Sequence, residues 1–386
     1  MIPKKVFVSA GESSGDMYAA QLVKALNSHW RGTEYFGCCG PQMAQAGVRT
    51  VIDSSVLSVV GLVEVLTHLP GIYRQYRKLV RAVASERPEM AILTDSPDFH
   101  LRVAKRMEAL GIPVIYLVAP QAWAWRQGRV KQMRRTIRRL LCLFPFEESF
   151  FRERGVNAHY IGHPLARTIR PSLSKHEFFQ KHAIPTDKPL IVLCPGSRRG
   201  EIARHMPYLM DAASRIQRSR GAHLVLASPL GFAARAGGSF FRERISGASI
   251  QVIEGETWDA LAHADLALTA SGTVTMEAAL LGTPLITYYR VTALSWMLGR
   301  WLVRVPFFSM VNLIAGKRVA PELMQNEMTG ERLAQEALFL LENEEARRAM
   351  RHGMEEVKQK LVSEQDPMEQ AARIVKEFFD EHERQH

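Results

Sequence analysis

The chain has 386 residues, of which 47% are hydrophobic and 23% are charged, and its formal net charge is +11 at pH 7. This composition excludes a low-complexity or disordered protein, and the length is sufficient for two domains of ordinary size. The positive charge indicates an anionic partner, which could be a nucleotide, a phosphorylated substrate, a nucleic acid or an acidic membrane surface.

The first half of the chain alternates strand-like and helix-like segments. A strand is predicted at residues 5–10, a glycine-containing turn at 11–16 and a helix at 17–26. Further strands are predicted at 90–94, 114–118 and 140–144. Such alternation is typical of an α/β domain with a parallel sheet.

A second unit of the same kind begins near residue 190. A predicted strand at 190–195 runs into a glycine turn at 196–201, as at the head of a doubly wound domain. The polar stretch 169–188 is the best candidate for the linker between the two halves. Later strands are predicted at 224–227, 251–253, 266–268 and 285–287, and the segment 330–386 has a helical pattern throughout.

The predicted fold class is therefore α/β, with two Rossmann-like doubly wound domains facing a cleft. We assign the N-terminal domain to residues 1–170 and the C-terminal domain to residues 188–345. The helices of residues 346–386 are expected to return to the first domain or to be swapped in a dimer. Ligands of open parallel sheets bind outside the carboxyl ends of the strands, where the predicted turns lie.

The turn after the strand at 266–268 indicates a nucleotide. Ser271 and Gly272 precede a helix that begins near Thr273, so backbone N–H groups and the positive helix end would face an anion. Glu277 lies about one turn further on, where a carboxylate can accept from a ribose hydroxyl. An ordinary turn is the alternative, but several glycine turns together favour nucleotide binding.

Arg198, in the turn after the strand at 190–195, is the strongest single cation candidate. A guanidinium can hold a pyrophosphate bidentately and stabilise it as it leaves. The sequence contains no Asp-x-Asp motif, so a metal-bridged diphosphate is not indicated, and we predict neither a metal nor another cofactor.

Carboxylates follow two predicted strands of the first half. Glu12 and Asp16 lie in the first glycine turn, where capping of the helix by Asp16 is an equally good interpretation. Asp95, Asp98 and His100 follow another strand and suit general-base chemistry on an alcohol. Helix capping by Asp95 or Asp98 is the alternative. Among the acids, Asp98 has the best position for catalysis.

Aromatic and basic residues lie together after the strand at 114–118. Trp123 and Trp125, beside Arg126, could form a wall for a sugar or an acyl chain, or could pack between domains. The basic run 126–139 is either a solvated helix face or a patch for phosphate or a membrane surface.

Two apolar stretches adjoin positive charge. Residues 54–68 are followed by a basic segment at 73–87, and the pattern is repeated at 294–304. Either these are core helices, or they dock at an anionic bilayer to reach a lipid. The longer apolar segment 294–315 contains arginines and a proline, which are costly in a bilayer core, so we do not expect it to span a membrane.

The cysteines and the N-terminus indicate the compartment. The spacing of Cys38, Cys39, Cys142 and Cys194 fits neither a metal site nor a disulfide framework, so free thiols in a reducing cytoplasm are expected. The first residues run directly into a strand and lack the apolar segment of a signal peptide.

A series of short segments in a fixed order extends from residue 5 to about residue 326. The segments are 10–16, 61–65, 96–99, 119–125, 143–147, 160–164, 195–198, 270–273 with Glu277, 310–312 and 321–325. This series closely resembles the lipid-A-disaccharide synthase family, which are bacterial glycosyltransferases of the glycosyltransferase-B fold. None of the motif positions departs from the family pattern.

The resemblance implies an inverting, metal-independent hexosyltransferase of lipopolysaccharide biosynthesis in a Gram-negative bacterium. It implies transfer of the sugar of UDP-2,3-diacylglucosamine to the 6-hydroxyl of 2,3-diacylglucosamine 1-phosphate (lipid X). The products are the β-1,6-linked lipid A disaccharide 1-phosphate and UDP. The N-terminal domain would bind the lipid acceptor and the C-terminal domain the UDP-sugar. A cytoplasmic enzyme peripherally associated with the inner membrane is expected, and a homodimer is left open.

Carried onto this sequence, the resemblance gives roles to named residues. The general base is assigned to Asp98, with Glu12, Asp16 and Glu64 as weaker candidates. UDP binding is assigned to Arg198, Ser271, Gly272, Thr273, Glu277, Asn312 and Gln325. Binding of the acceptor and its acyl chains is assigned to Val56, Val59, Val60, Leu62, Val63, Leu66, Trp123 and Trp125.

Two alternative functions stay open at this point. Another enzyme of the same fold that uses UDP-N-acetylglucosamine would share the Arg and Glu anchors but not the segments 96–99 and 119–125. A non-enzymatic basic protein could bind nucleic acid through residues 126–139, with an affinity that falls steeply with salt. The sequence matches no nucleic-acid reader module, so we predict no nucleic-acid partner.

Overall fold

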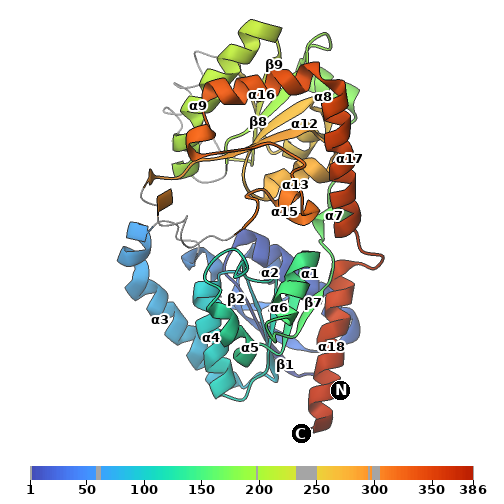
Figure 1. Cartoon of the computed structure of the whole chain (residues 1–386). Helices are drawn as coiled ribbons and strands as arrows, with labels where there is room; N and C mark the ends of the chain where they lie inside the picture. The colour runs from blue at the N-terminus through green and yellow to red at the C-terminus, as the bar shows by residue number, and fades with distance from the viewer. Residues whose placement is uncertain are drawn as a thin grey trace. The chain divides into compact units, whose positions relative to one another are not determined.

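The computed structural model describes residues 2–57, 62–196, 199–231, 250–293, 296–297 and 305–385, with the side chains of 62–69, 199 and 385 outside the description. The chain forms two compact units (Figure 1). The first consists of Met1–Pro164 and Ser363–His386, and the second of Leu165–Val362. Each unit contains one parallel sheet.

The first unit is built on a seven-stranded sheet of order β3-β2-β1-β4-β5-β6-β7. Its strands are β1 (Lys5–Ala10), β2 (Glu34–Cys39), β3 (Arg49–Asp53), β4 (Met90–Thr94), β5 (Val114–Leu117), β6 (Arg139–Cys142) and β7 (Ala158–Tyr160). The central strands β1, β4 and β5 are runs of buried residues because helices cover both faces of the sheet.

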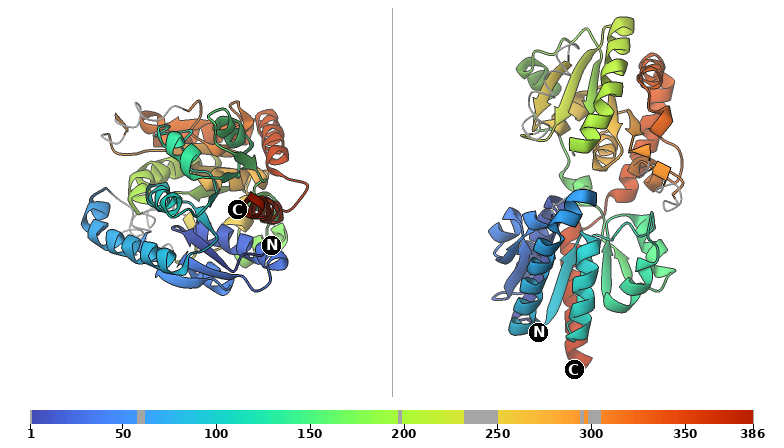
Figure 2. Two further views of the ribbon diagram at one scale, coloured as in Figure 1. Left: turned by 90° about the horizontal axis from the view of Figure 1, so that it is seen from below. Right: turned by 90° about the vertical axis from the view of Figure 1, so that its left-hand side faces the viewer.

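The helices of this unit divide between the two faces of the sheet (Figure 2). They are α1 (Ser13–His29), α2 (Pro41–Gln45), α3 (Leu62–Glu86), α4 (Pro97–Ala109), α5 (Arg129–Thr136), α6 (Pro145–Arg152) and α18 (Pro367–Gln385). The strand order runs outward from β1 and β4, and parallel crossovers are right-handed, so α1 and α4 cover opposite faces. Helix α1 packs with α2 and α18, whereas α4 packs with α3 and α5.

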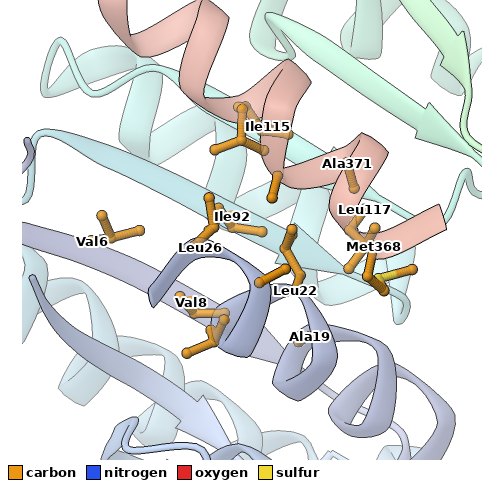
Figure 3. Packing of buried hydrophobic residues seen from close by; sticks show 14 of the residues in the cluster. Val6, Val8, Ala19, Leu22, Leu26, Ile92, Ile115, Leu117, Met368 and Ala371 are labelled. Carbon is orange, nitrogen blue, oxygen red and sulfur yellow. The ribbon is translucent and has the colours of Figure 1, made fainter. Parts of the chain in front are cut away.

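The C-terminal helix α18 completes the hydrophobic core of the first unit (Figure 3). Its residues Met368 and Ala371 are buried in the same cluster as Leu22 and Leu26 of α1 and Ile92 of β4. Full burial of a leucine side chain stabilises a fold by about 1.5–3 kcal/mol. Residues far apart in the sequence are therefore held together by one apolar cluster.

The second unit contains a six-stranded sheet of order β10-β9-β8-β11-β12-β13. Its strands are β8 (Leu190–Cys194), β9 (His223–Ser228), β10 (Ile250–Glu254), β11 (Leu266–Ala270), β12 (Leu285–Tyr289) and β13 (Glu322–Met324). Its helices are α7 (Leu165–Thr168), α8 (Lys175–Lys181), α9 (Arg199–Arg220), α12 (Thr257–His263), α13 (Thr273–Leu280), α15 (Met310–Ala315), α16 (Gly330–Glu342) and α17 (Glu344–Leu361). Helix α16 packs on α9, and α13 packs against α15 and α17.

The predicted α/β class with two doubly wound sheets is confirmed. Four strands escaped prediction, and they lie at Glu34–Cys39, Arg49–Asp53, Ala158–Tyr160 and Glu322–Met324. Three of them, β3, β7 and β13, are short and carry charged or half-buried residues, whereas β2 is a buried run that Gly37 interrupts. Among the described residues, no helix is long and apolar enough to cross a membrane.

Two expectations about the connections between the halves are wrong. The predicted linker at 169–188 contains helix α8 and belongs to the second unit, where Asp259 Oδ1 accepts from the N–H groups of Ser172 and Leu173, each at 2.7 Å. Of the segment 346–386, only α18 packs on the first unit, because α17 packs on α13, α15 and α16. An amphipathic pattern shows that a helix is covered, but it does not identify the partner.

Candidate active site

The first candidate site lies where β1 and β4 pair at the centre of the first sheet. The strand order runs in opposite directions from this pair, and ligands of such sheets bind at this point, beyond the carboxyl ends of the strands. Asp95, directly after β4, ties the two loops together. Its Oδ1 accepts from the N–H of Gly11 at 2.8 Å, and its Oδ2 accepts from the N–H of Glu12 at 3.0 Å.

The backbone at Asp95 is held in a conformation that side-chain-bearing residues rarely adopt. Asp95 has φ of +52° and Ser96 has φ of +38°, both in the left-handed region. The Asp95 carbonyl oxygen accepts a hydrogen bond from the Tyr116 hydroxyl and another from Nδ1 of His100, at 3.0 Å. Neighbouring strands and helices therefore fix the turn that aims the Asp95 side chain.

His100 is a neutral positioning residue beneath this turn. It is fully buried, and burial lowers its pKa to about 4. Because a carbonyl oxygen only accepts, Nδ1 carries the ring proton and donates to Asp95, while Nε2 accepts from Ser9 Oγ at 2.7 Å. The ring thus links the turn after β4 to strand β1.

The Asp95 carboxyl group is tuned to titrate near neutral pH. Burial raises its pKa to about 7, the two backbone N–H groups oppose this shift, and the charge of Glu12 adds to it. Only 11% of the side chain is exposed. A carboxylate with a pKa near the working pH can take a proton from an alcohol and release it later.

Glycines in the first turn make room for this carboxylate. A Cβ atom on Gly15 would lie 1.5 Å from Asp95 Oδ2, and one on Gly11 would lie 2.2 Å from Ser96 Oγ. Gly11 and Gly15 therefore lack side chains where Asp95 and Ser96 of the neighbouring loop pack closely against the first turn.

The partners of Asp16 argue against its assignment as a candidate base. Asp16 is buried, and its carboxylate accepts from the N–H groups of Gly40 at 2.8 Å, Gln42 at 2.9 Å and Met43 at 3.2 Å. It therefore holds the start of α2. Glu12 is exposed beside Asp95 and stays a candidate. Glu64 lies on α3, but its side chain is outside the described residues.

Asp98 is placed poorly for the base that we assigned to it. It lies in the first turn of α4, and 68% of its side chain is exposed. Its Oδ1 accepts from Arg126 at 2.9 Å and also from Arg129. Because two guanidiniums occupy this exposed carboxylate whereas that of Asp95 is buried, the geometry favours Asp95. The sequence shows both acids after one strand but not which of them is buried.

The residues assigned to the acceptor divide into different environments. Trp123 is a core residue, because its Nε1 donates to the buried Glu147 at 3.0 Å and its ring packs edge-on to Phe146. Burial raises the pKa of Glu147 to about 8. Trp125 and Val56 are half-buried. Val59 and Val60 lie outside the described residues, as do the side chains of Leu62, Val63 and Leu66.

The second candidate site lies at the corresponding point of the second sheet, where β8 pairs with β11. Ser271 follows β11, and its N–H donates to Tyr288 O at 2.8 Å while its Oγ donates to Phe308 O at 2.7 Å. Gly272 and Thr273 are exposed, and no described side chain caps the start of α13. The first N–H groups of α13 are therefore available to an anion. Arg198 lies outside the described residues.

Glu277 lies one turn inside α13 and is half-buried. Burial raises its pKa, and a hydrogen bond with Trp258 opposes this shift. Its place on the first turns of the helix agrees with the predicted contact to a ribose hydroxyl, which stays a prediction.

Asn312 and Gln325 already have internal partners, which argues against the predicted contacts with UDP. Asn312 Oδ1 accepts from the N–H groups of Val319 and Ala320, and its Nδ2 donates to Ala320 O and Glu322 Oε1, so its amide has four partners. Gln325 Oε1 accepts from the N–H of Val291 at 2.7 Å. Both amides hold loops of the second unit in place.

His205 and Arg290 are residues that the sequence did not indicate. His205 Nδ1 donates to Pro195 O at 2.8 Å, and its Nε2 accepts from the N–H of Arg290 at 3.1 Å. Burial lowers the pKa of His205, which keeps the ring neutral. The Arg290 guanidinium lies 4.6 Å from the centre of the Tyr208 ring. These residues come from distant segments, so no local pattern could reveal that they meet.

The fold, with one parallel α/β sheet in each of two units, is shared with solved glycosyltransferases and UDP-GlcNAc 2-epimerases. A glycosyltransferase from Rickettsia africae aligns with a TM-score of 0.60 and 11% identity, over 98% of this chain and 97% of that one. The UDP-GlcNAc 2-epimerase from Neisseria meningitidis bound to UDP-GlcNAc aligns with a TM-score of 0.60 and 13% identity, over 98% of this chain and 100% of that one.

The family is shown by sequence comparison. The family model described as lipid-A-disaccharide synthetase matches residues 6–376. The lipid-A-disaccharide synthase of Solibacter usitatus is 57% identical over 376 residues, which cover 97% of this chain and 98% of that protein. The chain belongs to the lipid-A-disaccharide synthetase family. It is a hexosyltransferase that forms the lipid A disaccharide, and this membership decides against the alternative functions.

Proposed function

We propose that the enzyme joins UDP-2,3-diacylglucosamine to lipid X in a single inverting displacement. The acceptor 6-hydroxyl oxygen attacks the anomeric carbon of the donor, and the bond from that carbon to the UDP oxygen breaks. The UDP oxygen keeps the electron pair, and the hydroxyl proton moves to a carboxylate of the first unit. Family membership supports the substrates, and the buried carboxylate of Asp95 is the observation that supports the mechanism.

Asp95 replaces Asp98 as the general base in this proposal. Its pKa of about 7 leaves a useful fraction ionised at neutral pH and still gives a base strong enough to accept the hydroxyl proton. The hydrogen bonds from Gly11 and Glu12 fix the carboxylate before substrate binds. General-base catalysis of this kind contributes about 10²–10⁴-fold to a rate.

The second unit stabilises the leaving group in the same proposal. The phosphates of UDP would lie at the start of α13, beside Gly272 and Thr273, and Glu277 would accept from the ribose. Arg198 stays the predicted cation for the pyrophosphate. The aligned backbone dipoles at the start of α13 would then stabilise the negative charge that develops on UDP.

Contact with the membrane is the third part of the proposal. Helix α3 presents exposed basic residues beside an exposed aromatic ring, at Arg74, Arg77, Lys78, Arg81 and Tyr73. Such a surface suits the cytoplasmic face of the inner membrane, where both lipid substrates would be collected. Flotation with anionic vesicles tests this contact, and sedimentation velocity tests whether the chain forms a homodimer.

Incubation of the purified enzyme with both diacylated substrates tests the reaction. We expect equimolar UDP and a disaccharide phosphate, whose β-1,6 linkage is checked by nuclear magnetic resonance. Release of UDP without disaccharide would overturn the proposed acceptor. Activity on the non-acylated sugar nucleotide alone would instead indicate a different sugar-nucleotide reaction.

A further inference from the structure

We propose that Arg126 and Arg129 bind the phosphate group of the acceptor, and that Asp98 occupies this position as a counter-ion until the phosphate displaces it. The inference rests on the proposed function, because it takes lipid X as the acceptor. It gives a role to the aromatic and basic segment after β5, which the general-base mechanism does not use.

The two guanidiniums form a converging pair. They lie 4.5 Å and 5.3 Å from the centre of the Trp125 ring, for Arg126 and Arg129 respectively. Both donate to one oxygen of Asp98, Oδ1. Two arginines and one carboxylate leave a net charge of +1, whereas a phosphate dianion would neutralise the pair and offer more acceptor oxygens. The chemistry of the pair therefore fits phosphate better than it fits the resident carboxylate.

The pair is also organised before any ligand binds. Trp125 contacts both guanidiniums through cation–π interactions, and the side chains of Arg129 and Arg126 are 15% and 49% exposed. Arg126 has φ of +55°, a strained backbone conformation that is characteristic of binding and active sites. The Asp98 side chain is 68% exposed, so the carboxylate can move into solvent. A ligand phosphate would bind without ordering long side chains.

Arg129 of the pair, its partner Asp98 and the proposed base Asp95 lie near the same tyrosine, Tyr116. Burial raises the pKa of the Tyr116 hydroxyl, and the charge of Asp95 raises it further. Arg129 lowers this pKa and Asp98 raises it, so these charges all lie near the hydroxyl. An acceptor sugar with its 6-hydroxyl at Asp95 would therefore bring its anomeric phosphate toward Arg129 and the neighbouring Arg126, because only the ring oxygen separates C1 from C5, which carries the 6-hydroxymethyl group.

Acceptors with and without the phosphate group test the inference. Wild-type enzyme is compared with R126Q and R129Q on lipid X and on 2,3-diacylglucosamine, which lacks the phosphate. We expect KM for lipid X to rise by about 10- to 100-fold in each variant, because a charged hydrogen-bonding partner is lost. Turnover of the dephosphorylated acceptor should stay within about twofold of wild type, because that acceptor makes no such contact.

Two further variants make the outcome decisive. Arg135 lies on α5, as Arg129 does, and is exposed and paired with Glu108 at 3.1 Å. R135Q should therefore leave KM and turnover for both acceptors unchanged. D98N should keep KM for lipid X at or below the wild-type value. Equal losses on both acceptors in R126Q and R129Q, or no preference of the wild type for the phosphorylated acceptor, would overturn the inference. If wild type makes no disaccharide from either acceptor, the proposed function itself is wrong.

Discussion

The carboxyl edges of the two sheets hold the same topological position but carry opposite chemistry. After β4 the chain turns through left-handed residues and directs the Asp95 carboxylate into the neighbouring loop. After β11 the chain opens directly into α13, with exposed Gly272 and Thr273 at its start. One edge therefore raises the basicity of a buried acid, and the other presents free N–H groups to an anion. The turn between strand and helix decides which chemistry the shared scaffold supports.

The largest expected effect is at the carboxyl edge of the first sheet, which holds Asp95. D95N should lower kcat/KM by about 10²–10⁴-fold, because Asp95 is a buried acid whose raised pKa suits a general base. D98N should keep most of the turnover, because Asp98 is exposed and paired with Arg126. The wild-type kcat/KM should rise with pH and level off above about 7, since the base acts only when ionised and burial places its pKa at about 7. Initial rates between pH 5 and 9 measure both. A greater loss in D98N than in D95N would restore the original assignment.

Asn312 in the second unit has a buried side-chain amide, which we expect to stabilise the fold and not to bind UDP. N312A should lower the free energy of unfolding by about 2–5 kcal/mol, because the N–H groups of Val319 and Ala320 lose their acceptor. Denaturant unfolding measures this loss. Calorimetry well below the melting temperature should show UDP affinity within about threefold of wild type, since the side chain contacts no ligand in this interpretation. A stable N312A protein that fails to bind UDP would support the predicted direct contact.

Alanine substitutions of glycines at the two sites should have smaller effects, and these should differ between the sites. G15A should destabilise the first unit by about 1–3 kcal/mol and reduce turnover, because the new methyl group would collide with Asp95 Oδ2. G272A is the matched control, since a Cβ there meets nothing within 4 Å. It should unfold like wild type in thermal denaturation. Comparable melting temperatures for the two variants would show that the first glycine turn does not depend on the approach of Asp95.

The smallest effect concerns the ribose contact. E277Q should weaken UDP binding by about tenfold, because an amide oxygen is a weaker acceptor than a carboxylate. Isothermal titration with UDP measures the change, and E331Q, an exposed acid at the start of α16, serves as the control. Equal affinities in E277Q and E331Q would remove Glu277 from the nucleotide site.

Local patterns predicted the long central strands well and the short strands poorly. The strands at residues 5–10 and 90–94 were found to the residue, because buried parallel strands are continuous apolar runs. Strand β7 has three residues and half-buried positions, so it carries no such run. The turn at Ser271 and Gly272 was placed correctly before α13, since small residues before a helical pattern mark its start.

The sequence by itself determined the α/β class, the two-unit plan, the position of the turn before α13 and, through its series of motifs, the family. Only the tertiary structure decided that Asp95 and not Asp98 is the buried acid, and that α18 but not α17 joins the first unit. These facts depend on contacts such as that between Gly11 and Asp95, which are 84 residues apart. Burial and pKa arise where distant segments meet, and no local pattern records that meeting.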